Sequence, residues 1–337
     1  MPANLTPQYH KAEEVYKQAK TSEEKIAALE EMLRAMPKHK GTDHLQADLK
    51  RRIAKLREEE SRPKSKKAAF DPFRVEKGGA GQVLLLGAPN AGKSAIVARL
   101  TSAPTQPTPF PFATQGPIPG MMAHEDVQVQ LVDLPPITPD YFPSGMLGLV
   151  KSADGALLVA DLSSDLVLDD LETILAKVSE GRVRLFDPAV QTAGAPADSD
   201  EVLLVRIPAL LLANKGDADG AQDRLELLRE LYQGRFDPLV ISAETQEGLD
   251  RLPGAVFGML KRIRIYSKEP GKPVDRSSPF VLKEGDTVLD LAARIHRDFP
   301  EHLKQARVWG SARFEGQAVQ RDYVLRDRDV VELQVDL

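Results

Sequence analysis

The residues with the clearest chemical purpose are the eight of Gly87-Ala-Pro-Asn-Ala-Gly-Lys93-Ser94, which directly follow an apolar run at 83–86. The two glycines let backbone N–H groups converge on phosphate oxygens, and the lysine brings a cation to the β- and γ-phosphates. The hydroxyl of Ser94 suits Mg²⁺, and a helix that begins at Lys93 would add the positive end of its dipole. We therefore predict a triphosphate site whose contact residues are Gly87, Asn90, Ala91, Gly92, Lys93 and Ser94.

Three further motifs follow in order, each placed after an apolar run. Asp133 ends one such run and would hold Mg²⁺ through water. In Asn214-Lys215-Gly-Asp217 the carboxylate of Asp217 can accept both N1–H and the exocyclic amine of guanine, an arrangement that adenine does not offer. Ser242 and Ala243 would place a backbone N–H against guanine O6. The order of the motifs indicates a guanine site made by Asn214, Lys215, Asp217, Ser242 and Ala243.

A proline-rich stretch, residues 104–114, separates the phosphate loop from Asp133. Its prolines exclude a regular helix and predict an extended loop. Thr114 at its end could close over Mg²⁺ and the γ-phosphate, which would make the stretch a switch. The alternative is a proline-rich connector with an incidental threonine.

The elements that must position these residues predict a doubly wound α/β domain over residues 80–266. Both buried and half-exposed strands are expected, because some apolar runs are continuous and others alternate with glutamine. The expected strands are 83–86, 127–131, 156–160, 209–213 and 239–242. The expected helices are 169–178, 222–232 and 247–263, and a polar surface loop is expected at 187–201.

Two further segments flank this domain. Residues 1–68 carry apolar positions at helical spacing on both sides of Pro37 and predict a helical hairpin followed by a basic linker at 61–67. Residues 271–337 predict a small α+β module with a helix at 288–299. Its expected strands are 280–282, 306–309, 317–319 and 330–335.

Composition excludes several functions. The chain of 337 residues has no cysteine, which rules out disulfides, thiolate metal sites and a cysteine nucleophile. Its six histidines lack ligand spacing, so we expect no metal beyond that of the nucleotide. No apolar run reaches the length of a membrane span, and we expect no membrane contact and a cytoplasmic location. A net charge of −5 gives no global reason to expect nucleic-acid binding.

Taken together, Gly-Ala-Pro-Asn-Ala-Gly-Lys-Ser, Pro-Phe-Ala-Thr, Asp-Leu-Pro-Pro, Asn-Lys-Gly-Asp and Ser-Ala resemble the five motifs of a translation-factor-class GTPase. The chain is most similar to the Obg and developmentally regulated GTP-binding protein family, whose helical region its N-terminal words Lys-Ala-Glu-Glu and Pro-Lys-His-Lys-Gly-Thr also resemble. The segment Pro-Phe-Val-Leu-Lys-Glu-Gly-Asp-Thr, with Ala-Arg-Val-Trp-Gly-Ser, resembles a TGS domain, a ubiquitin-like β-grasp module. The resemblance implies a P-loop G domain between a helical hairpin and a TGS domain.

The resemblance also implies roles for single residues. Thr114 becomes the switch-one ligand of Mg²⁺ and the γ-phosphate, and Asp133 the switch-two aspartate, so that Ser94, Thr114 and Asp133 form the metal set. Asn90 resembles an asparagine that holds K⁺ beside the phosphates in potassium-stimulated GTPases, where the cation neutralises charge on the β–γ bridge. Lys93, Thr114 and Asn90 are thus the implied catalytic group. A plain turn residue is the alternative for Asn90.

Two departures from the family pattern concern the γ-phosphate. Pro136 stands where the family has a glycine whose N–H reports that phosphate, and proline has no N–H. Ile137 stands where many small GTPases orient the attacking water with glutamine. We therefore expect slow intrinsic hydrolysis.

Two hypotheses follow, besides a weaker one of an ATP-using P-loop enzyme. The first is a slow GTPase that binds GTP and GDP and acts as a monomeric switch on the ribosome or another RNA through its N-terminal basic helices and TGS domain. The alternative is a scaffold that binds GTP with little or no turnover. The basic residues are Lys38, Lys40, Lys50, Arg51, Arg52, Lys55, Arg57, Arg62, Lys64, Lys66 and Lys67.

Overall fold

The computed structural model describes residues 6–19, 22–36, 43–61, 72–102, 116–191 and 204–336. The chain divides into two compact units, Met1–Asp71 and Pro72–Leu337. Within the described ranges, no helix has the length and apolar character needed to cross a membrane.

The N-terminal unit has three described helices and not the two of the expected hairpin. They are α1 (Pro7–Gln18), α2 (Ser22–Ala35) and α3 (Asp43–Ser61). The additional helix, α1, begins after Thr6, whose hydroxyl accepts the N–H of Tyr9, and Pro7 occupies its first turn. Helix α1 has few apolar residues at helical spacing, so the sequence pattern did not predict it as a separate helix. Tyr9 and Ala12 nevertheless pack with residues of α2 and α3 in one core.

The larger unit contains two sheets, of which the first has the order β2-β3-β1-β4-β6-β5, with β7 also paired to β6. All its described pairs are parallel except β2 with β3. The strands are β1 (Gln82–Gly87), β2 (Ile118–His124), β3 (Val127–Asp133), β4 (Gly155–Asp161), β5 (Val183–Phe186), β6 (Val205–Asn214) and β7 (Leu239–Val240). Strands β2 and β5 were not expected from the sequence.

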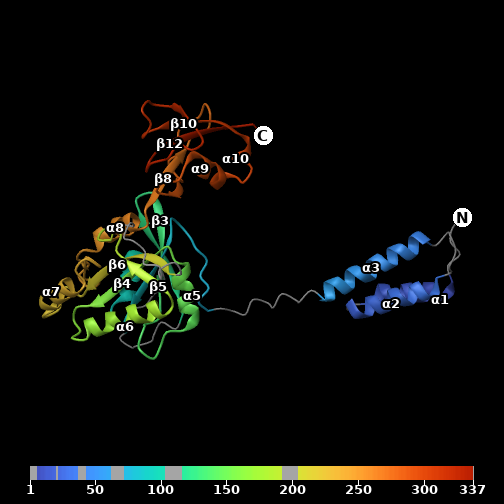
Figure 1. The fold of residues 1–337 in the computed structure, drawn as a ribbon, viewed down its shortest axis with the longest axis horizontal. Helices are drawn as coiled ribbons and strands as arrows, with labels where there is room; N and C mark the ends of the chain where they lie inside the picture. Colours follow the sequence, from blue (N-terminus) through green and yellow to red (C-terminus); the bar gives the residue numbers. More distant parts are fainter. Residues whose placement is uncertain are drawn as a thin grey trace. The chain divides into compact units, whose positions relative to one another are not determined.

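Helices cover both faces of this sheet (Figure 1). Side chains of β1 alternate between two cores, because Leu84 and Leu86 belong to one and Val83 and Leu85 to the other. Helices α5 (Ser144–Ser152), α6 (Val167–Glu180) and α7 (Ala221–Leu231) cover the first core, and α4 (Lys93–Leu100) and α8 (Leu252–Met259) the second. The expected doubly wound α/β class is confirmed.

The second sheet has the order β11-β10-β12-β8-β9 and packs against a helix as in a β-grasp module. Thr287 and Asp290 form a capping box at the start of α9, at the expected turn. The elements are β8 (Arg262–Ser267), β9 (Phe280–Lys283), α9 (Val288–Ile295), α10 (Phe299–His302), β10 (Leu303–Trp309), β11 (Gln317–Val319) and β12 (Val330–Val335).

Residues 262–266 were assigned from the sequence to the α/β domain, but strand β8, which they form, belongs to the second sheet. It pairs with β12 and β9, so the second sheet begins at Arg262. The expected helix 247–263 is correspondingly shorter, since α8 ends at Met259. The helix was predicted too long because Ile263 and Ile265 follow the apolar residues of α8 closely in the sequence. Both isoleucines nevertheless alternate with arginine, which is typical of a strand.

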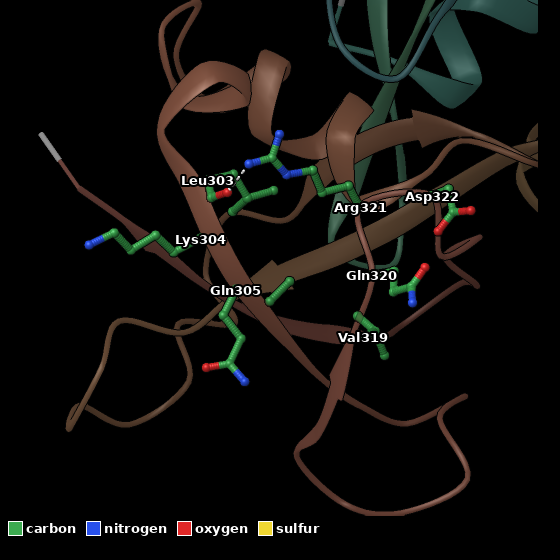
Figure 2. A pocket seen from close by; sticks show the side chains of 8 residues that line it. Leu303, Lys304, Gln305, Val319, Gln320, Arg321 and Asp322 are labelled. Atoms are coloured by element: carbon green, nitrogen blue, oxygen red, sulfur yellow. Dashed lines mark hydrogen bonds between the residues drawn. The ribbon is translucent and has the colours of Figure 1, made fainter.

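A pocket of about 430 Å³ lies along the outer strands of this sheet, between β10 and the chain that leaves β11. Strand β11 is shorter than β10, and the Arg321 guanidinium donates to the Leu303 carbonyl beyond the last paired residue (Figure 2). The arginine thus satisfies a backbone acceptor that a longer strand would have used.

Candidate nucleotide-binding site

The phosphate loop connects β1 to α4 and buries its lysine. Lys93 is 6% exposed, and its Nζ donates to the carbonyl oxygens of Gly87 at 3.0 Å and Ala88 at 2.9 Å. Burial lowers the pKa of Lys93 to about 8, and the negative charge of Asp133 opposes this shift. Among the described residues, the hydrogen bonds of this buried ammonium go to carbonyl oxygens, and a cation in such surroundings attracts an anion, which is the property that a phosphate site requires.

Ser94 and Asp133 meet beside this lysine. The Ser94 hydroxyl donates to Asp133 Oδ2 at 2.5 Å, and Asp133 is fully buried at the end of β3. A hydroxyl and a carboxylate oxygen are the donors that Mg²⁺ prefers. The two residues therefore fit the magnesium site predicted for them.

Asn214, at the end of β6, joins the predicted phosphate and base motifs. Its Nδ2 donates to the Ala91 carbonyl at 2.8 Å, and its Oδ1 accepts the N–H of Ala243 at 3.1 Å. Gly92 has a φ of 94°, and a Cβ at Gly92 would come within 2.2 Å of the asparagine amide. Only glycine permits this approach, so three motifs that lie far apart in the sequence form one hydrogen-bonded unit.

Lys215 makes an ion pair that sequence reasoning missed. Its Nζ lies 2.6 Å from Asp161 Oδ2 and 3.2 Å from the Ser163 hydroxyl. Asp161 is 8% exposed and also accepts the N–H and hydroxyl of Ser163. Asp161 ends a buried parallel strand beside β6, and this position at the carboxyl edge of the sheet was the available signal.

The remaining predicted residues occupy different surroundings. Asp217 and Asn90 are exposed, and Asn90 has a φ of 60°, which asparagine tolerates better than most residues. Ser242 is 1% exposed and its hydroxyl accepts the N–H of Thr245 at 3.0 Å. Thr114, predicted to ligate Mg²⁺, lies outside the described residues.

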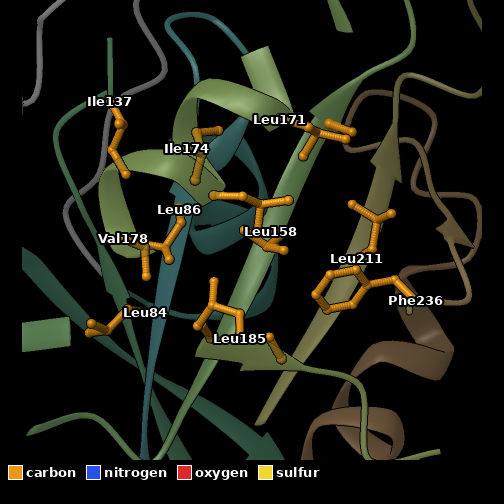
Figure 3. Close-up of a cluster of buried hydrophobic side chains, with 14 of the residues drawn as sticks. Leu84, Leu86, Ile137, Leu158, Leu171, Ile174, Val178, Leu185, Leu211 and Phe236 are labelled. Carbon is orange, nitrogen blue, oxygen red and sulfur yellow. The ribbon is translucent and has the colours of Figure 1, made fainter. Parts of the chain in front are cut away.

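The segment after Asp133 differs from the expected arrangement at the γ-phosphate. Pro136 is buried, and Ile137 is 2% exposed within the core that α5 and α6 cover, together with Leu86 and Ile174 (Figure 3). The Ile137 N–H donates to the Gly87 carbonyl at 3.1 Å. An isoleucine at this position gains more from the core than from solvent, so its side chain does not line the site.

The chain resembles known GTPases at the level of both sequence and fold. Residues 82–186 match the 50S ribosome-binding GTPase family, and residues 263–334 match the TGS domain. Developmentally-regulated G-protein 2 of Arabidopsis thaliana is 27% identical over 92% of this chain and 90% of its own length. Over most of its length this chain is thus similar to the developmentally regulated GTP-binding proteins. An uncharacterized GTP-binding protein of Methanocaldococcus jannaschii is likewise 27% identical over 93% of both chains.

The fold also agrees with a solved structure. The YchF GTPase of Schizosaccharomyces pombe aligns with 77% of this chain and 100% of its own, at 15% identity and a TM-score of 0.51. The predicted resemblance to the developmentally regulated family, the G-domain fold and the TGS domain are thus confirmed. The match of the TGS family begins at Ile263 and so takes in β8, as the sheet does.

Proposed function

We propose that this chain belongs to the developmentally regulated family, and that it binds GTP and GDP and hydrolyses GTP slowly with Mg²⁺, as a switch in a ribosome- or RNA-related process. The observation that carries the proposal is the buried Lys93 beside the Ser94–Asp133 pair, tied through Ala91 to Asn214. A cation bonded to carbonyl oxygens, two hard oxygen donors and a guanine-type motif together match a magnesium–GTP ligand.

Residues of the site would divide the work as follows. Ser94, Asp133 and Thr114 would hold Mg²⁺, which supplies charge neutralisation at the phosphates. Lys93 would hold the β- and γ-phosphates, while Asp217 and the Ala243 N–H would recognise guanine. K⁺ held by Asn90 would raise the rate of turnover.

The buried segment 134–137 supports the slow rate. Its fourth residue, Ile137, lies in the core, and its N–H is already bonded to Gly87. A group that orients the attacking water would have to come from elsewhere. The same observation favours the alternative, a GTP-binding scaffold with little or no turnover.

Phosphate release from GTP over several turnovers, with KCl or NaCl at equal ionic strength, decides between the two. The GTPase proposal predicts measurable turnover that is faster in K⁺, is lost in Lys93→Ala and loses its K⁺ preference in Asn90→Ala. Tight GTP binding by calorimetry without turnover in either salt would establish the scaffold. ATP that displaces GTP at equal concentration would contradict guanine specificity.

The proposed RNA contact uses α3. Lys50, Arg51, Arg52, Lys55 and Arg57 are all exposed there, and among them Arg57 pairs with Glu30 at 2.6 Å. Exposed basic side chains on one helix suit phosphate groups. The TGS domain is the second proposed contact, and we propose a cytoplasmic monomer.

Co-sedimentation with ribosomal particles, in GDP and in a non-hydrolysable GTP analogue, tests this contact. Neutralising Lys50, Arg51 and Lys55 to glutamine should weaken binding and reduce its dependence on salt. Lys11→Gln and Lys17→Gln on α1 provide the control. No sedimentation of the wild-type protein in either nucleotide would contradict the ribosomal role.

A further inference from the structure

The β2–β3 hairpin joins the nucleotide site to the TGS domain. Its open end pairs Ile118 with Asp133, and its closed end pairs His124 with Val127 across the turn Glu125-Asp126. Seven residues per strand span about 20 Å. Asp133, the proposed magnesium ligand, therefore lies at one end of a short, regular hairpin, and the turn Glu125-Asp126 lies at the other.

Charged groups of the TGS domain hold the turn at the other end. The Arg264 guanidinium donates to Glu125 and, at 2.9 Å, to Asp126. The Tyr266 hydroxyl donates to Asp126, and Arg328 Nη2 donates to Glu125 at 2.7 Å. These contacts bind both carboxylates of the turn to β8 and to the loop that precedes β12.

Arg264 is fixed on the TGS side as well. Its Nε and Nη2 donate to the two oxygens of Asp327 at 3.0 and 2.6 Å, and the Asp327 carboxylate also accepts the Arg264 N–H. The side chain is 4% exposed, and its Cζ lies 5.3 Å from the ring centroid of Phe257 on α8. Because the planar guanidinium bonds carboxylates of both domains, the Arg264 side chain is held in one rotamer. It therefore forms a rigid joint between the G domain and the TGS domain.

Strand β8 explains why the joint connects two cores. Its alternate residues Ile263 and Ile265 pack into the TGS core, while Arg262, Arg264 and Tyr266 lie on the opposite face and contact the G domain. Arg262 makes a separate ionic contact, with Asp154 Oδ1 at 3.0 Å, at a point away from the hairpin. A shift of the turn is therefore transmitted to the strand that the TGS sheet is built on.

The segment that normally follows a switch-two aspartate is less able to transmit a signal. Residues 134–137 are buried, and Ile137 is bonded through its N–H to Gly87. Movement there would break core packing. The hairpin remains as the described element that joins Asp133 to another domain.

We propose that the β2–β3 hairpin couples the nucleotide site to the TGS domain, with Arg264 as the residue that transmits the coupling. This inference depends on the nucleotide binding proposed above. Coupling is reciprocal, so a partner that binds the TGS domain and shifts β8 also shifts the relative affinities for GDP and GTP.

The single tryptophan, Trp309, can report on the surroundings of β8. Trp309 on β10 pairs with Val330 on β12, and Val330 pairs with Tyr266 on β8. Its emission is measured in the full chain with Mg²⁺ and either GDP or a non-hydrolysable GTP analogue, and hydrogen exchange of residues 262–267 and 330–335 is followed in parallel. Both readouts should differ between the two nucleotides in the wild-type protein. Calorimetry measures the affinity for each nucleotide separately.

Arg264→Gln should reduce the difference between the nucleotides at least fivefold while GTP affinity stays within about threefold. Asp126→Asn, which keeps the TGS side of the joint intact, should reduce it in the same direction. The matched control is Arg262→Gln, on the same face of β8, which should keep the difference within twofold.

The proposal is overturned if the wild-type chain binds both nucleotides with identical Trp309 emission and hydrogen exchange. It is also overturned if the difference persists in both Arg264→Gln and Asp126→Asn. Absence of nucleotide binding in calorimetry would overturn the proposed function itself and the coupling with it.

Discussion

Two buried cations in this protein have opposite surroundings. Lys93 is 6% exposed and bonds two carbonyl oxygens, whereas the Arg264 side chain is 4% exposed and bonds three carboxylates. Burial lowers the pKa of Lys93 to about 8. Hydrogen bonds from Arg264 to Asp327, Glu125 and Asp126 outweigh burial and raise the arginine pKa above its usual value.

The difference shows how a buried charge indicates its role. A cation whose pKa is lowered by burial lacks compensation in the ligand-free protein, and it gains that compensation when an anion binds. A cation whose pKa is raised is already compensated, so it holds parts of the chain together. Lys93 is by this criterion a residue for ligand binding, and Arg264 a residue for assembly.

Replacing Lys93 tests the first half of this comparison and should have the largest effect. In Lys93→Met, affinity for GTP should fall by about 150-fold or more, because a charge-assisted contact in a desolvated site contributes about 3 kcal/mol or more. The free energy of unfolding of the ligand-free protein should not fall by more than about 1 kcal/mol, since an uncompensated buried charge is removed. Calorimetry and urea unfolding measure the two quantities. A large loss of stability without nucleotide would break the comparison.

Replacing Arg264 should produce the reverse pattern. Arg264→Met leaves three carboxylates without their cation, and we expect a loss of about 2–3 kcal/mol in the free energy of unfolding. This is less than for a fully buried pair, because the side chains of Glu125 and Asp327 are 49% and 36% exposed. GTP affinity should stay within about threefold. Unfolding in urea gives the first quantity and calorimetry the second, with Arg307→Met on the exposed face of β10 as the control.

Asp217 allows a test of base recognition that is independent of the cation. In Asp217→Asn the side chain offers an amide donor in place of a carboxylate oxygen, which suits the O2 carbonyl of xanthine and not the amine of guanine. The ratio of GTP to XTP affinity should shift by about 30-fold or more towards XTP. Asp219→Asn, two residues further along, is the control. An unchanged ratio would remove Asp217 from the proposed guanine site.

The pH dependence should be the smallest effect. Only protonated Lys93 neutralises phosphate charge, so GTP affinity should fall about sevenfold between pH 7 and pH 8.8 as Lys93 of the free protein loses its proton. The contribution of Lys93 to folding runs the other way. Between the folded pKa of about 8 and the unfolded value of 10.5 the unfolded chain binds more protons, and stability from this group rises with pH.

Calorimetry in two buffers of different ionisation enthalpy should accordingly show uptake of a proton on GTP binding near pH 8. Lys93→Arg keeps its charge throughout this range and should lose the pH dependence. Equal affinities at both pH values in the wild-type protein would show that Lys93 is not the titrating group.

The sequence predicted the parts of the site that depend on local pattern. Glycine spacing and an apolar run are sufficient to place Lys93, and the end of a strand is sufficient to place Asp133. The orientation of Ile137 could not be predicted, because the core that receives it is built from α5 and α6. Asp161 and Lys215 come together at the carboxyl ends of the neighbouring strands β4 and β6, so their pairing follows from the strand order and not from spacing in the sequence.

The same limit applies to the fold. Strands β1, β3, β4, β6 and β7 follow from apolar runs and were expected, whereas β2 and β5 were not. The Arg264 joint was not expected either, because Asp327 lies about two hundred residues along the chain from Glu125 and Asp126. Strand β8 was placed in the wrong domain because its isoleucines fit either neighbour until its pairing with β12 is known.

The shared strand has a consequence for how the chain can be divided and synthesised. A G-domain fragment that ends at Tyr266 would carry β8 with neither of its sheet partners, so Ile263 and Ile265 would be open to water beside an unpaired strand edge. Such an edge promotes aggregation. During synthesis, β8 must likewise wait until β12 has been made before its parallel pair can form, and the ion pairs on its other face keep it on the finished G domain in the meantime.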